Sequence, residues 1–73
     1  MTAPTGDAKA LGQRLRRARE ERGLSQKEVA QALGLVRPAI SHMESGDRHV
    51  RALEATALCR LYRISVSDLL AGL

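Results

Sequence analysis

The side chains best suited to catalysis are few in this sequence and lie in separate segments: His42, His49 and Cys59. Nucleophilic catalysis needs a base within hydrogen-bonding reach of the nucleophile, and acid–base catalysis by carboxylates needs a shared pocket. The spacing of these residues indicates neither arrangement, and it supplies no set of ligands for a metal ion. We therefore expect no enzyme activity, no cofactor and no metal site, and we interpret Cys59 as a small buried hydrophobic residue.

A different chemistry is indicated by residues 37–45, where side chains that form hydrogen bonds recur at helical spacing. The outer face of a helix over this range would carry Arg37, Pro38, Ser41, His42 and Ser45. An exposed helix with hydrogen-bonding groups of this reach fits the major groove of DNA. An arginine there can bind guanine in a bidentate manner, which is worth roughly 1–3 kcal/mol against the wrong base. A phosphate contact and a solvated side chain are the alternatives for Arg37.

Two short helices joined by a tight turn must position these residues. Ser25 and Glu28 form a capping box that predicts the start of the first of them, and Gly34 predicts its end. A steep helix crossing requires a small residue at the contact and a residue that accepts a positive φ in the turn, which Ala30 and Gly34 supply. The apolar residues at inward-pointing spacings are Val29, Leu33, Leu35, Ile40 and Met43. Residues 25–44 therefore predict a helix-turn-helix.

The remaining sequence predicts an N-terminal arm and three further helices. Residues 1–7 have the composition of a flexible arm that ends in a helix cap at Asp7. Apolar spacing predicts the further helices over about residues 8–22, 53–61 and 66–70. The only aromatic residue is Tyr62, which favours packed helices over a sheet. We expect a single all-α domain of five helices over residues 8–73.

The charge of the chain suits a polyanionic partner without requiring one. The sequence has 12 Lys and Arg against 8 Asp and Glu, a net charge of +4 and an isoelectric point near 10.2. The predicted first helix carries much of the basic charge, in Lys9, Arg14, Arg16, Arg17, Arg19 and Arg22. A solvated helix face and a face that contacts phosphates explain this cluster equally well. Neither a signal peptide nor a membrane span is indicated, so we expect a cytoplasmic, nucleoid-associated protein with no membrane partner.

The segment QKEVAQALGLVRPAISHMESG at residues 26–46 resembles the helix-turn-helix of the phage Cro and repressor (Cro/C1) type, the xenobiotic-response-element-like (XRE) regulators. The resemblance covers about residues 10–72. It includes Arg-x-x-x-Gly-Leu-Ser-Gln at 19–26, Ala30 with Gly34, Ile40-Ser41, Glu44-x-Gly46, and Ile-Ser-Val-Ser-Asp-Leu-Leu at 64–70. This family implies a compact five-helix, lambda-repressor-like fold. It also implies a transcription regulator, a repressor or autoregulator, that binds double-stranded DNA by sequence. The alternative is an antitoxin or adaptor whose main role is to bind a protein partner, such as a toxin, protease or polymerase.

The resemblance also assigns roles to particular residues. The positions that reach base edges are matched by Arg37, Pro38, Ser41 and His42. Arg19 and Glu44 match an ion pair that ties the first helix to the third. Gln26 matches the first residue of the second helix, whose side chain and N-terminal amides lie against a phosphate, and a solvated helix start is the alternative.

Further phosphate contacts are expected from residues at the helix ends and in the loop after residue 45: Ser25, Ser45, Arg48 and Arg51. A solvated loop would have the same composition as the segment that holds the two arginines. For His42 the alternatives to a base contact are a phosphate contact or none, and for Ser41 the alternative is a bond to the backbone.

Two positions depart from the family pattern. The position before Arg37 often carries Ser or Thr, which caps the helix and contacts a phosphate, whereas this chain has Val36. Pro38 stands where many relatives carry Gln, Ser or Thr, so it offers only an apolar contact, such as one with a thymine methyl. We therefore expect specificity to depend mainly on Arg37 and on DNA shape.

A single domain of this size buries too little DNA surface for useful affinity. We therefore expect a homodimer that reads a palindromic operator as two half-sites about one helical turn, ~34 Å, apart. The predicted interface is the C-terminal segment with Leu69, Leu70 and Leu73, because these leucines exceed what a small core can hold and related folds pair there.

Overall fold

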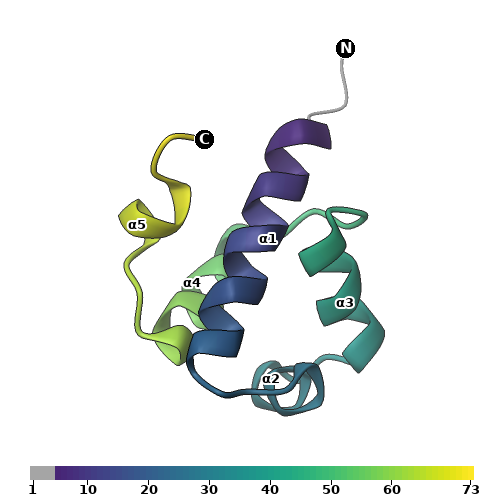
Figure 1. Cartoon of the computed structure of the whole chain (residues 1–73). Helices are drawn as coiled ribbons and strands as arrows, with labels where there is room; N and C mark the ends of the chain where they lie inside the picture. The colour runs from purple at the N-terminus through teal and green to yellow at the C-terminus, as the bar shows by residue number, and fades with distance from the viewer. Residues whose placement is uncertain (1–4) are drawn as a thin grey trace.

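The computed structural model describes residues 5–73, which form five helices around one apolar core (Figure 1). The helices are α1 (Thr5–Glu21), α2 (Gln26–Leu33), α3 (Arg37–Ser45), α4 (Ala52–Tyr62) and α5 (Val66–Leu70). The described part of the chain contains no strand, so the all-α prediction is confirmed. No helix in it is long and apolar enough to cross a membrane.

The ends of α2 follow from local hydrogen bonding. The Ser25 Oγ accepts a hydrogen bond from the Glu28 N–H at 3.0 Å, and the Glu28 carboxylate accepts one from the Ser25 N–H at 2.8 Å. This is the predicted capping box. At the other end Gly34 has a φ of 70°, and its N–H closes the last turn of the helix. A residue with a Cβ would be strained at this φ, so the predicted stop is confirmed.

The start of α1 corrects the sequence prediction. The helix begins at Thr5, whereas the sequence placed its cap at Asp7 and assigned residues 1–7 to an arm. Asp7 lies inside the first turn, where a negative charge is stabilised by the positive end of the helix dipole. Residues 1–4, the remainder of the predicted arm, lie outside the described residues.

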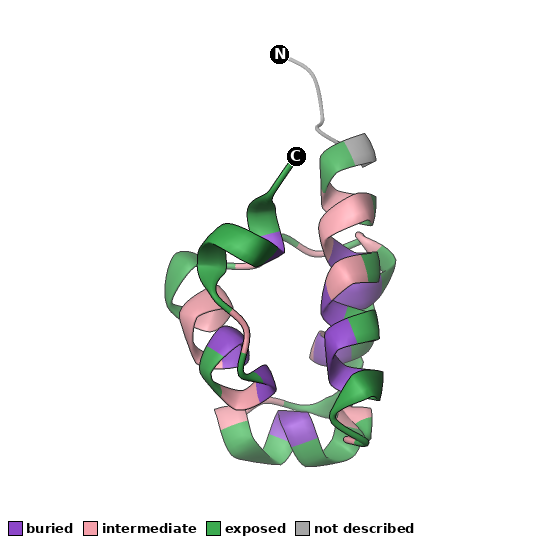
Figure 2. Cartoon of the chain, turned by 60° about the vertical axis from the view of Figure 1, so that its left-hand side comes forward, coloured by how far each residue is buried: buried purple, intermediate pink, exposed green. Residues whose placement is uncertain are grey.

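The core is built from aliphatic side chains and one aromatic ring. It consists of Leu15, Ala18, Val29, Ala30, Ile40, Met43, Leu58, Cys59, Tyr62 and Leu69. The buried residues face inward from the surrounding helices (Figure 2). Four of the predicted scaffold residues are in this set, and Leu33 and Leu35 are partly buried against it. Burial raises the pKa of the Cys59 thiol, as expected for an inert buried cysteine.

The start of α3 lacks the capping side chain that helix N-termini favour. Val36 occupies the cap position with no side-chain hydrogen bond, and it is 68% exposed. Val36→Thr should therefore raise the free energy of unfolding by about 1 kcal/mol, because the hydroxyl can accept the Ala39 N–H, which now bonds only to the Val36 carbonyl, while Pro38 has no N–H to donate. Urea denaturation followed by circular dichroism measures this change. Val66→Thr, at the first residue of α5, is the control and should stay within about 0.5 kcal/mol of the parent. If the two substitutions changed the free energy of unfolding equally, the threonine at position 36 would not be stabilising α3 as a helix cap.

Candidate nucleic-acid interface

The turn between α2 and α3 is fixed by backbone hydrogen bonds. The Leu35 N–H donates to the Ala30 carbonyl at 2.8 Å, and the Ala39 N–H donates to the Val36 carbonyl at 3.0 Å. The inner face of α3 packs against both α1 and α2 through Ile40 and Met43, which are buried. The outer face of α3 is left free.

The outer face of α3 brings together the residues predicted to read bases. Those residues, Arg37, Pro38, Ser41 and His42, are all exposed. They come from two successive turns of one helix, which lies at the edge of the molecule in Figure 1. The chain therefore presents one guanidinium, one hydroxyl and one imidazole on a face of the size that a major groove accepts.

A buried ion pair holds α3 in place. The Arg19 Nε donates to the Glu44 Oε2 at 2.6 Å, and the Arg19 Nη2 donates to the Glu44 Oε1 at 3.1 Å. The same guanidinium donates through Nη1 to the Leu24 carbonyl at 2.7 Å. The hydrogen bond to Glu44 raises the pKa of Arg19. The ion pair implied by the resemblance is present, and it joins α1, the α1–α2 turn and α3.

Gln26 extends this pair to the start of α2. The Gln26 Nε2 donates to the Glu44 Oε1 at 2.9 Å, so the side chain is bound to α3 rather than freely solvated. The second N–H on Gln26 Nε2 has no partner among the described residues, so it can still donate to a phosphate oxygen. The hydroxyl of Ser25 accepts the capping N–H described above, which leaves its own proton free to be donated.

The loop between α3 and α4 corrects one predicted phosphate contact. The Arg48 guanidinium forms a bidentate ion pair with Glu54, with Nη1–Oε1 and Nη2–Oε2 distances of 2.8 Å each. The Glu54 Oε1 also accepts the N–H of Arg51 at 3.0 Å, at the start of α4. The hydrogen bond from Arg48 lowers the pKa of Glu54 to about 2. Arg48 is thus engaged inside the chain, while the side chain of Arg51 is exposed and has no partner among residues 7–73.

The end of α3 contains a carboxylate that the sequence reasoning did not use. The Ser45 hydroxyl lies 3.0 Å from the Asp47 Oδ2 and 3.1 Å from the His42 carbonyl oxygen, so its single proton is donated locally. The His42 Nδ1 lies 3.6 Å from the same Asp47 oxygen. Asp47 therefore adds negative charge next to His42 and occupies the hydroxyl predicted to contact a phosphate. In the sequence, only the position of Asp47 two residues after Ser45 could have indicated this contact.

The basic cluster of α1 serves mostly the fold. The Arg14 Nη1 donates to the carbonyls of Leu69 (3.0 Å) and Ala71, and the Arg22 Nε donates to the Tyr62 carbonyl at 2.9 Å. Arg16 pairs with Glu20 at 3.2 Å on the surface. Within the described part of the chain, only Lys9 and Arg17 of this cluster have no hydrogen-bonding or ionic partner. The sequence left two explanations for this cluster, a solvated face and a phosphate-binding face. Neither accounts for Arg14, Arg19 and Arg22, which bond groups within the fold.

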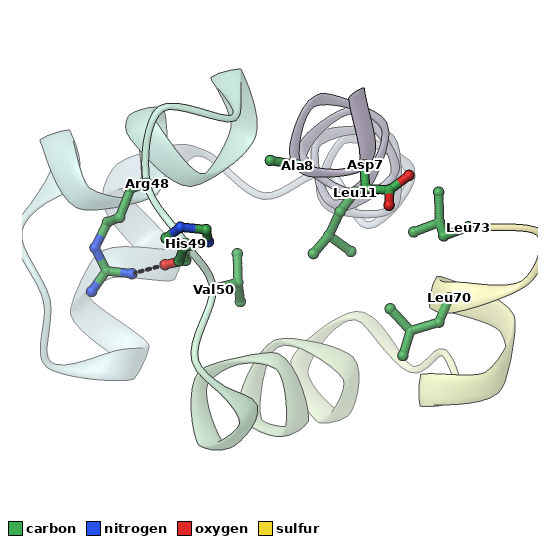
Figure 3. Close-up of a pocket in the computed structure, with 8 residues that line it drawn as sticks. All are labelled: Asp7, Ala8, Leu11, Arg48, His49, Val50, Leu70 and Leu73. Atoms are coloured by element: carbon green, nitrogen blue, oxygen red, sulfur yellow. Dashed lines mark hydrogen bonds between the residues drawn. The ribbon is translucent and has the colours of Figure 1, made fainter. Parts of the chain in front are cut away.

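The predicted dimer interface divides into two parts. Leu69 is only 2% exposed because it packs into the core, so its assignment to the interface is wrong. Neighbouring residues of a helix point about 100° apart, and Leu70 is accordingly 46% exposed. Leu70 and Leu73 line a groove of about 400 Å³ (Figure 3). The rest of its lining is apolar in part, from Ala8, Leu11 and Val50, and polar in part, from Asp7, Arg48 and His49.

Comparisons with known proteins agree with this geometry. A family described as "Helix-turn-helix domain" matches residues 10–71. The chain is 39% identical over 62 residues to the HTH-type transcriptional regulator DdrOP3 of Deinococcus deserti, which covers 85% of this chain. It spans only about half (48%) of the length of that relative.

Solved structures with the same fold are regulators as well. The restriction-modification controller protein C.AhdI from Aeromonas hydrophila aligns with a TM-score of 0.81 and 34% identity, over 88% of this chain and 97% of that one. The clp gene regulator ClgR from Corynebacterium glutamicum aligns with a TM-score of 0.83 and 30% identity, over 88% and 68%. With the motif, the buried ion pair and the helix-turn-helix geometry in place, the chain belongs to the helix-turn-helix domain family, in its Cro and repressor (XRE) type.

Proposed function

We propose that the chain is a DNA-binding transcription regulator that reads the major groove with the outer face of α3. The observation that carries the proposal is the free face of this helix, held against the core by the Arg19–Glu44 pair. The relatives support it, since DdrOP3 is an HTH-type transcriptional regulator and C.AhdI is a controller protein. A repressor or autoregulator is the form proposed, acting on a chromosomal operator at the nucleoid in the cytoplasm.

The proposed DNA complex has two kinds of contact. Arg37 donates to a guanine, Ser41 and His42 contact neighbouring base edges, and Pro38 contacts a thymine methyl. The backbone N–H groups at the start of α2 bind a phosphate together with the free Nε2 N–H of Gln26, as helix N-termini favour. Ser25 and Arg51 supply further phosphate contacts. These contacts position the protein without selecting a sequence.

The regulator is proposed to act as a homodimer on a palindromic operator. The exposed leucines Leu70 and Leu73 lie near each other beside the groove (Figure 3). An isologous interface there can bury both leucines of each copy. The two copies of α3 would then enter successive major grooves about one helical turn, ~34 Å, apart. A salt-dependent gel shift on the promoter region of its own gene, after selection of sites from random DNA, tests the function. Absence of any preferred site would contradict it.

Arg37→Ala should reduce the preference for the selected site over random DNA by roughly 1–3 kcal/mol, about 5- to 150-fold, because the guanine contact is lost. Fluorescence anisotropy titrations on the operator, on an operator with that guanine replaced, and on random DNA measure the change. Arg51→Ala is the control, since loss of a phosphate contact should weaken all three DNAs alike and reduce the salt slope by about one. Equal losses on operator and random DNA for Arg37→Ala would remove Arg37 from the base-reading set.

A further inference from the structure

The C-terminal helix α5 is too short to hold its own shape. It has five residues, whereas isolated helices shorter than about 12–15 residues are marginal in water. Only Leu69 of this helix is buried in the core. Gly72 is left-handed, with a φ of 78°, but the residue that directly follows the helix is Ala71, with a φ of −58° and a ψ of 125°, so α5 is not closed directly as α2 and α3 are. Its last carbonyl groups therefore need partners from elsewhere.

One side chain bonds two carbonyl groups here, that of Leu69 in the helix and that of Ala71 just after it. The Arg14 Nη1 on α1 donates to the Leu69 carbonyl at 3.0 Å and to the Ala71 carbonyl, across 55 and 57 residues of sequence. The other hydrogen bond at this end is local, from the Leu73 N–H to the Leu70 carbonyl at 3.1 Å. Arg14 thus fixes the C-terminal end of α5 to α1 by a contact that no sequence periodicity indicates.

We infer that Arg14 is a positioning residue for dimerisation. It holds Leu70 and Leu73 in place along one side of the groove, and a second copy of the chain covers this groove in the dimer. Leu70 and Leu73 face Leu11 across this groove (Figure 3). Their segment would be loose without the two carbonyl contacts, and ordering it on association would weaken binding. The inference rests on the proposed homodimer, in which these leucines form the interface.

The test measures the dimer dissociation constant by sedimentation equilibrium on the full chain. Arg14→Gln should weaken the dimer at least tenfold, because the neutral amide cannot span both carbonyls. Arg17→Gln removes the same charge three residues along α1, from a side chain that has no partner among the described residues, and should change the constant less than twofold. An Arg14→Gln dimer as tight as the parent would overturn the inference. A parent chain that is monomeric at hundreds of micromolar would instead refute the proposed dimer itself.

A double-mutant cycle distinguishes positioning from a general loss of stability. If Arg14 acts through the leucines, Arg14→Gln combined with Leu70→Ala should weaken the dimer by less than the product of the two single factors, with the remaining effect of Arg14 acting through Leu73. Fully additive effects on the dissociation constant would overturn the inference. Amide exchange of the monomer should show lost protection at Leu73, with the protection of core amides such as Leu58 unchanged. If Arg14→Gln does not fold, Arg14→Lys decides: it can reach one carbonyl and should weaken the dimer by an intermediate factor, and a parent-like constant would refute the role.

Discussion

Replacing Glu44 with alanine should lower the free energy of unfolding by about 3–5 kcal/mol, because it leaves the guanidinium of Arg19 buried without its counter-charge. Glu44 and Arg19 are 7% and 9% exposed, so the guanidinium is shielded from bulk water. The Gln26 amide loses its partner at the same time. A domain of this size has roughly 4–11 kcal/mol of stability, so we expect the variant to lose about half of it and to unfold at a clearly lower urea concentration.

Urea denaturation followed by circular dichroism measures this loss. Glu20→Ala is the matched control, since Glu20 also pairs with an arginine but does so in solvent, and its loss should cost less than about 0.5 kcal/mol. The double substitution Arg19→Met with Glu44→Leu should restore much of the stability, because no unpaired charge is then buried. If the double variant is as unstable as Glu44→Ala, the loss comes from packing rather than from the unpaired charge.

Local signals predicted most of the fold. The capping box at Ser25 and the glycine at 34 are interactions within one turn of chain, so their sequence spacing alone defines the ends of α2. The apolar spacing of α3 likewise predicted which face is free, and Arg37, Ser41 and His42 are exposed as expected. The family resemblance supplied the Arg19–Glu44 pair, whose partners are 25 residues apart.

Contacts between distant segments could not be predicted in the same way. Arg48 was expected at a phosphate, but its partner Glu54 lies on the next helix, and the choice depends on how the loop folds back. Leu69 was assigned to the interface because the sequence shows three leucines near the end, and only the docking angle of α5 determines which of them enters the core. Arg14 and its carbonyl partners are joined by tertiary structure alone.

Gly12→Ala should destabilise the fold by about 1–2 kcal/mol, although alanine is the better helix former. A Cβ built on Gly12 would lie 2.6 Å from the Met43 carbonyl oxygen and closer still to that of Glu44, both on the backbone of α3. Backbone cannot move aside as a flexible side chain can, so α1 and α3 must separate. Overpacking of this kind costs typically about 1–3 kcal/mol and occasionally more, while the gain in helix propensity is roughly 1 kcal/mol at most.

Gln13→Ala is the control for Gly12→Ala, because Gln13 is the next residue of α1 and is exposed. It gains helix propensity without a steric contact and should leave stability unchanged within about 0.5 kcal/mol in the same urea titration. A Gly12→Ala variant as stable as Gln13→Ala would show that the two helices do not approach so closely.

The contact between α1 and α3 also matters for function, since Met43 and Glu44 are on the inner face of the helix that carries Arg37. If α3 is displaced in Gly12→Ala, the protein should lose affinity for DNA. The loss should be larger on the operator than on random DNA, because base contacts depend more steeply on the position of the helix than phosphate contacts do.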